Sequence, residues 1–238
     1  MTTFPNRINR PLERLGLPDG SRWFGIFVGV VTHVVDPDGQ GRVRVELPWA
    51  RDEDGSPYTG WCRLVTPMAG PSRGVWFVPD TGDEVAVMFE GGDPRRPYVM
   101  GGLWNGVDEP PEAMDAAGDN DIRAIHSKSG IRIVMDDTPS AVAFTVDTPG
   151  GQRIELEDDP ATLRLRDANG NSVELAPGGI TIQCSAKLSI TASSIEVSAG
   201  SVTTNSGMSK FSGVVDANTV ITPSVVGSSY TPGAGNIW

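Results

Sequence analysis

The chain has 238 residues and a mass of 25.2 kDa, which is enough for one large domain or two small ones. Its 30 acidic and 19 basic residues give a net charge of −11, which argues against nucleic acid or an anionic membrane surface as a partner, since both need clustered Lys and Arg. Two cysteines are too few for a disulfide-stapled secreted scaffold, and the N-terminus has no apolar run of the kind found in signal peptides.

The first half of the chain predicts short strands separated by turns. The β-branched run GIFVGVVTHVV ends at a turn, residues 36–39, and in the next segment Val43, Val45 and Leu47 share one face. The segments WCRLV, GVWFV, EVAVMFE and PYVMGGLW follow, each bracketed by Gly, Pro or Asp. Short strands without a helical period favour a small antiparallel barrel of the OB type, because closure removes free strand edges.

A Pro-rich acidic segment, residues 107–121, reads as a linker, and alternating apolar residues resume after it. The alternating segments are Ile131-x-Ile133, Val142-x-Phe144-x-Val146, Ile154-x-Leu156, Leu163-x-Leu165, Val173-x-Leu175 and Ile180-x-Ile182. A spacing of two predicts strands in each of them.

Three seven-residue repeats continue the pattern: LSITASS, IEVSAGS and VTTNSGM, starting at Leu188, Ile195 and Val202. A coiled coil needs apolar spacings of three and four, and disorder does not predict strict alternation, so short strands with turns are favoured. Short strands cannot bury their apolar faces alone, so the repeats must stack or pair with other chains. Because the spacing shortens toward the C-terminus, we expect a tapering β-prism in an intertwined oligomer.

The segment Gly70-Pro-Ser-Arg-Gly74 matches the G-x-S-x-G motif of serine hydrolases. That motif requires a helix after the serine, but the strand-like residues 75–78 follow it. Histidine could act as the base only at His33 and His126. We therefore expect a hairpin loop here and no catalytic residues.

Acidic clusters raise the possibility of calcium binding or glycoside hydrolysis. They are Asp36/Asp38, Asp52/Glu53/Asp54, Asp136/Asp137 and Asp158/Asp159. None has the spacing of an EF-hand loop, and no aromatic sugar platform is identifiable beside them. We interpret them as solvated turn residues.

The remaining candidates also lack the patterns that chemistry requires. The chain has no C-x-x-C or H-x-H motif, so Cys62 and Cys184 are expected to be buried free thiols. Arg95 and Arg96 lie outside any phosphate-loop motif and read as loop charges. The sequence predicts no catalytic, cofactor-binding or metal site.

Residues 30–106 resemble the OB domain of the central spike proteins of contractile tails: VgrG proteins, the phage baseplate assembly protein V family and spikes of extracellular contractile injection systems. The similar stretches are DPDGQGRVRV (36–45), LPW (47–49), WCRLV (61–65), AGPSRG (69–74), FVPDTGDEVAV (77–87) and GGDPRRPYVMG (91–101). From Asn120 the chain resembles the β-helical needle of the same proteins. The similar stretches there are SGIRIVMDD (129–137), TPGGQRIEL (148–156), DANGNSVEL (167–175) and the ending SSYTPGAGNIW (228–238).

With the resemblance, the expected fold is all-β: an N-terminal OB barrel followed by an intertwined, trimeric, tapering β-helix. We assign residues 1–21 to a hub-contacting segment, 22–106 to the barrel, 107–121 to the linker, 122–209 to the needle and 210–238 to the tip segment. The resemblance implies a homotrimer that pierces a target envelope mechanically, without enzymatic activity or cofactor. It would assemble in the bacterial cytoplasm as part of a phage-tail-like particle.

The resemblance also implies two partners. Only residues 1–21 precede the barrel, so we expect the hub to be a separate chain, contacted by Arg7, Arg10, Leu12 and Leu15. No histidine follows His126 to form a metal-binding tip, so we expect a separate PAAR-type tip protein. Exposed aromatics favour contacts, and Tyr230 and Trp238 are the expected tip-binding residues.

Two other functions stay open at this point. An envelope-degrading baseplate component would show muralytic activity, and an OB-type adaptor would be a monomer with a protease-sensitive C-terminal half. The sequence leaves open whether the apparatus is a phage tail, an extracellular injection system or a type VI apparatus.

Overall fold

The computed structural model describes residues 22–52 and 54–229. In this part of the chain the regular structure is almost entirely β, apart from the short 3-10 turn η3 (Glu90–Gly92). Contacts divide the chain into two units, residues 1–186 and 187–238. Among the described residues, no helix is both long and apolar enough to span a bilayer.

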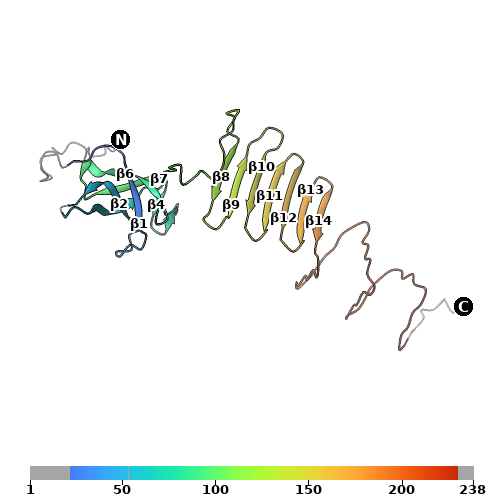
Figure 1. Cartoon of the computed structure of the whole chain (residues 1–238). Helices are drawn as coiled ribbons and strands as arrows, with labels where there is room; N and C mark the ends of the chain where they lie inside the picture. Colours follow the sequence, from blue (N-terminus) through green and yellow to red (C-terminus); the bar gives the residue numbers. More distant parts are fainter. Residues whose placement is uncertain (1–21, 53, 230–238) are drawn as a thin grey trace, which may run out of the picture. The chain divides into compact units, whose positions relative to one another are not determined.

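Five strands of the first unit form a closed barrel in the order β1-β2-β3-β7-β6 (Figure 1). They are β1 (Phe27–His33), β2 (Arg42–Arg51), β3 (Pro57–Leu64), β6 (Glu84–Phe89) and β7 (Pro97–Gly102). Strands β3 and β7 are parallel, and the other neighbours are antiparallel. The predicted OB-type barrel is confirmed.

Alternating residues of these strands fill the barrel. Val43, Val45 and Leu47 are at most 2% exposed, as the alternation in β2 predicted. Gly29 of β1 lies against them: a Cβ there would stand 2.4 Å from Val45 Cγ1. A glycine at this position is therefore what allows β1 and β2 to pack closely.

The G-x-S-x-G segment is a hairpin, as predicted. Strands β4 (Ala69–Gly70) and β5 (Arg73–Gly74) pair directly, and Ser72 lies between them with a φ of 54°. His33 belongs to β1 and His126 to a strand of a different sheet. The structure therefore gives this serine the setting of a turn residue.

The interpretation of Asp36 as a solvated turn residue is wrong. Its side chain is only 5% exposed, and its two oxygens accept hydrogen bonds from the backbone N–H groups of Asp38, Gln40 and Arg42 at 3.1, 2.8 and 3.1 Å. The guanidinium of Arg42 adds an ion pair at 2.7 Å. These bonds hold the pKa of the Asp36 carboxyl well below its usual range, chiefly through Arg42. The carboxylate organises the β1–β2 turn.

The second sheet of the first unit is a seven-stranded antiparallel meander in sequence order (Figure 1). Its strands are β8 (Ile122–His126), β9 (Arg132–Asp136), β10 (Ala143–Asp147), β11 (Arg153–Asp158), β12 (Ala161–Arg166), β13 (Ser172–Ala176) and β14 (Gly179–Gln183). The alternating segments between residues 131 and 183 thus form strands as predicted. The sequence did not predict β8.

The expectation of strands in the seven-residue repeats is not met by a single chain. After β14, residues 184–229 contain no strand. A strand exists only where its N–H and C=O groups find a pairing edge. The alternating pattern indicates that these residues can form strands, but it does not identify the chain with which they pair.

We expect Asp36→Asn to weaken the barrel at neutral pH and to flatten its acid unfolding. Because the pKa of Asp36 is lower in the folded state, its contribution to stability is complete above about pH 4 and is lost as pH falls further. Denaturant midpoints followed by tryptophan fluorescence between pH 2 and 7 would measure this. Glu109→Gln, at an exposed acid outside the barrel, is the control; equal pH profiles for the two variants would contradict the role of Asp36.

Candidate assembly face

The two faces of the β8–β14 sheet have opposite character. Strand register places Phe144 opposite both Met135 and Leu156, while Thr145 lies opposite Val134 and Glu155. Because side chains alternate along a strand, each apolar row continues on one face across the sheet. One face is therefore apolar and the other carries most of the charges.

The apolar face consists of two rows: the first runs from β9 to β14, since Arg123 holds its position in β8, and the second crosses all seven strands. The first row contains Met135, Phe144, Leu156, Leu163, Leu175 and Ile180. The second row contains Ile125, Ile133, Val146, Ile154, Leu165, Val173 and Ile182. Together they form the apolar face.

This face is incompletely buried in a single chain. Phe144, Leu156 and Leu165 are 38%, 41% and 42% exposed, although they lie in the middle of the sheet. Burying such a side chain completely stabilises a structure by roughly 1.5–3 kcal/mol relative to full exposure. A continuous apolar surface of this kind marks an interaction site.

Several charges of the opposite face are paired within that face. Arg153 contacts Asp147 at 2.8 Å and Glu155 at 2.6 Å, and Arg164 contacts Glu174 at 3.0 Å and also Glu157. Glu155 is only 8% exposed, and the hydrogen bond from Arg153 lowers its pKa. These ion pairs form within one chain, whereas the apolar face stays partly exposed in one chain.

The segment interpreted as a linker is attached to the sheet. Glu112 Oε1 accepts hydrogen bonds from Arg132 Nε and Nη2 at 3.1 and 2.6 Å and lies 3.0 Å from His126 Nε2. Arg132 chiefly, with His126, lowers the pKa of Glu112. Residues around Glu112 therefore form a strap over the charged face at β8 and β9.

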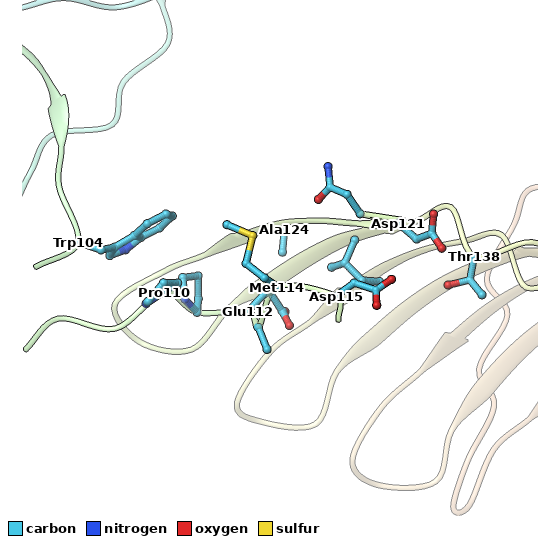
Figure 2. Close-up of a pocket in the computed structure, with 12 residues that line it drawn as sticks. Trp104, Pro110, Glu112, Met114, Asp115, Asp121, Ala124 and Thr138 are labelled. Atoms are coloured by element: carbon cyan, nitrogen blue, oxygen red, sulfur yellow. The ribbon is translucent and has the colours of Figure 1, made fainter. Parts of the chain in front are cut away.

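A hollow of about 360 Å³ lies beneath this strap (Figure 2). Its lining includes Trp104, Met114 and Ala124. Near its far end, carboxylate oxygens of Asp115, Asp119 and Asp121 lie within 4.8 Å of one another, a cluster that the sequence analysis did not identify. Asp115 Oδ1 already accepts a hydrogen bond from Ala117 N at 2.8 Å, so part of this cluster serves a turn.

The barrel carries an aromatic surface that the sequence analysis also did not single out. Trp76 and Phe77 are 74% and 72% exposed and, with Val65 and Met68, line a hollow of about 910 Å³ around the β4–β5 hairpin. The sequence analysis predicted a strand over GVWFV, but residues 75–78 form no strand in the structure. Nothing in the described residues covers Trp76 and Phe77.

The remaining predicted residues divide into confirmed and corrected ones. Cys62 is buried, and burial raises the pKa of its thiol to about 12. Cys184 is exposed, so the prediction of a buried thiol is wrong there, because the chain leaves the sheet at that residue. Arg95 pairs with Asp93 at 2.9 Å and Arg96 with Glu90 at 3.4 Å, which confirms them as structural loop charges.

The predicted partner contacts lie outside the described residues. This applies to Arg7, Arg10, Leu12 and Leu15 on the hub side and to Tyr230 and Trp238 on the tip side.

Two protein families match the chain. Residues 27–104 match the type VI secretion system/phage-baseplate injector OB domain, and residues 143–208 match the phage baseplate V C-terminal trimerisation domain. The second match spans most of the apolar face and extends into the seven-residue repeats.

Curated relatives include spike proteins of type VI secretion systems. The chain is 30% identical to spike protein VgrG1b of Pseudomonas aeruginosa over 141 residues, 56% of this chain and 19% of the relative. It is 33% identical to VgrG2a of the same species over 88 residues, 37% of this chain and 10% of the relative. It is 32% identical to the actin cross-linking toxin VgrG1 of Vibrio cholerae over 90 residues, 34% of this chain and 8% of the toxin. The matched segments thus cover a fifth or less of each relative.

We expect Leu156→Asp to abolish self-association through the apolar face. A carboxylate in the middle of that face would have to be buried without a partner, which is strongly unfavourable. Light scattering should show the mass falling to that of one chain, while circular dichroism retains the β signal of the barrel. Arg166→Asp, exposed on the opposite face and away from β14, is the matched control. Equal masses for both variants would exclude the apolar face as the assembly surface.

Proposed function

We propose that the chain is a VgrG-like spike protein of a contractile injection system, that it is the mechanical spike of this apparatus and that it acts as a homotrimer. The observation that carries this proposal is the half-exposed apolar face, most of which coincides with the matched trimerisation domain. Three copies with their apolar faces inward would form a prism with a dry interior. The ion-paired faces would form its outer surface.

Such a prism has the properties that a piercing device needs. Backbone groups paired between strands make the shaft stiff, and the Arg–Glu contacts of the charged face satisfy its polar groups at the surface. The role is structural rather than enzymatic. The relatives are named as spike proteins, and the match to the relative named as a toxin covers only 8% of it.

The proposal includes two attachments. Residues 1–21, with Arg7, Arg10, Leu12 and Leu15, would contact a separate hub, and the C-terminal end, with Tyr230 and Trp238, would hold a PAAR-type tip protein. Assembly would take place in the bacterial cytoplasm, in a phage tail, an extracellular injection particle or a type VI apparatus.

The purified chain should have a native mass near three times 25.2 kDa and migrate as an SDS-resistant species on unboiled gels. Multi-angle light scattering and gel electrophoresis measure both properties. Burial of the apolar face in a trimer is the physical reason for the expected mass and resistance. A monomer with a protease-sensitive C-terminal half would instead support the adaptor function, and turnover of peptidoglycan would support the enzymatic one.

Deleting residues 228–238 should release the tip protein and leave the trimer intact, because the apolar face lies outside the deleted segment. Co-purification of the tagged chain with the tip protein measures this. Deleting residues 1–21 serves as the matched control, since it should remove hub binding and keep the tip. Tip retention after the C-terminal deletion would contradict the assignment of Tyr230 and Trp238.

A further inference from the structure

Three turns at one edge of the β8–β14 sheet have the same construction. They are residues 127–131, 148–152 and 167–171, and in each the first and fifth residues pair through the backbone. The side-chain oxygen of the first residue, Ser127, Thr148 or Asp167, accepts a hydrogen bond from the backbone N–H of the fifth at 3.0, 3.2 and 2.8 Å. Each turn therefore needs a hydroxyl or carboxylate at its first position.

Each turn also has glycine at its fourth position. Gly130, Gly151 and Gly170 have φ values of 86°, 79° and 82°, and the N–H of each donates to the carbonyl of the first residue. Side chains strongly disfavour this left-handed region, so glycine is required there. The motif [S/T/D]-x-x-G-x thus folds the chain back three times.

The fourth turn at this edge would fall on residues 184–188, directly after β14, and the motif is broken at both essential positions. Cys184 replaces the oxygen acceptor, and Lys187 replaces the glycine. Instead of closing a hairpin, Ser185 donates through its backbone N–H and its hydroxyl to Asn171 Oδ1 at 3.0 and 3.3 Å. The chain is tied to the preceding turn and leaves the sheet.

The missing turn leaves β14 with an open edge. Within the described residues this strand pairs only with β13. Ile180 and Ile182 are 70% and 57% exposed, whereas Leu175 beside Ile180 is 40% exposed and Val173 beside Ile182 is partly buried. On its outer edge, the side away from β13, strand β14 therefore has neither a hydrogen-bonded strand nor apolar side chains beside it.

The next alternating segment of the chain fits this edge. Residues 189–193 carry Ile190 and Ala192 at the same spacing of two as Ile180 and Ile182, and this segment has no strand partner among residues 22–52 and 54–229. Every copy thus contributes one open edge and one unpaired segment. If the unpaired segment of each copy pairs with the open edge of the next copy, three copies can close into a ring.

We propose that residues 184–188 are a strand-exchange point: the edge of β14 is completed by residues 189–193 of a neighbouring copy, because the chain lacks the turn that would bring its own segment back. This inference rests on the proposed homotrimer. It specifies where pairing within one chain ends and pairing between chains begins.

Disulfide trapping tests the exchange. Thr181→Cys in β14 is combined with a cysteine at position 189, 191 or 193, each in a Cys184→Ala background. If residues 189–193 pair with β14, the side chains at positions 181, 189, 191 and 193 lie on the same face of the sheet, because side chains alternate along a strand. Directly opposite residues on paired strands have Cβ atoms about 4.5–5.5 Å apart, which approaches the range that disulfides need. Cys62 is buried and stays unreactive. Thr181→Cys with Ser209→Cys is the control and should not cross-link.

Mild oxidation and non-reducing SDS electrophoresis should give a covalent trimer for at least one of the three pairs. A disulfide within one chain, or none for any pair, would overturn the exchange. Light scattering before oxidation separates this failure from that of the proposed function. A trimeric mass with an intrachain disulfide contradicts the exchange alone, whereas a monomeric mass contradicts both.

A second variant tests the cause. Cys184→Asp with Lys187→Gly restores the acceptor and the glycine, so the chain should fold back on its own β14. Trapping between positions 181 and 191, with the same two substitutions present, should then yield intrachain disulfides. Cys184→Ala with Lys187→Ala removes the same side chains without restoring the motif and should keep the interchain product. Interchain disulfides alone in the restored variant would overturn the role of the turn.

Discussion

The seven-stranded sheet depends on removing one apolar face from water. Its rows of Leu, Ile, Val and Phe align because successive strands pair in register, and no other part of its own sheet can cover them. A sheet has two faces, and the apolar face of this one stays about 40% exposed at Phe144, Leu156 and Leu165. Several charges of the opposite face are paired within one chain. Association through the apolar face is the arrangement that resolves this constraint.

The barrel buries its apolar residues within one chain. Strand β6 closes onto β1, so every strand of the barrel has two neighbours, and Val43, Val45, Val85 and Val87 are at most 1% exposed. The barrel is therefore closed within one chain, whereas the sheet leaves its apolar face partly exposed. In the proposed spike, the shaft would gain its rigidity from association, whereas the barrel is closed within one chain.

Turn chemistry controls where self-pairing stops. An oxygen acceptor and a glycine are present in the turns that begin at Ser127, Thr148 and Asp167 and absent at residues 184–188. Folding back is local and rapid, whereas pairing with another chain must wait for association. Because the meander ends at β14, each chain presents a formed strand edge. In the proposed exchange, residues 189–193 of a neighbouring copy would pair with this edge in a defined register.

The sequence by itself determined the features that depend on local pattern. Alternation predicted the barrel strands and the strands from residue 131 to 183, but the strand that it predicted over residues 75–78 does not form. It missed β8, because Ile122 and Ile125 are three residues apart and lie on opposite faces. It also misjudged Asp36, whose exposure depends on Arg42 folding back over it.

Only the tertiary structure decided which strands pair, and therefore which surfaces stay open. The register showed that apolar residues from seven strands share one face, that Glu112 of the supposed linker binds Arg132, and that Cys184 is exposed. The repeats after Leu188 show the reason most clearly. Alternation specifies that a segment can be a strand, but a strand forms only when hydrogen bonds to a neighbour are available, and that neighbour is a property of the assembled fold.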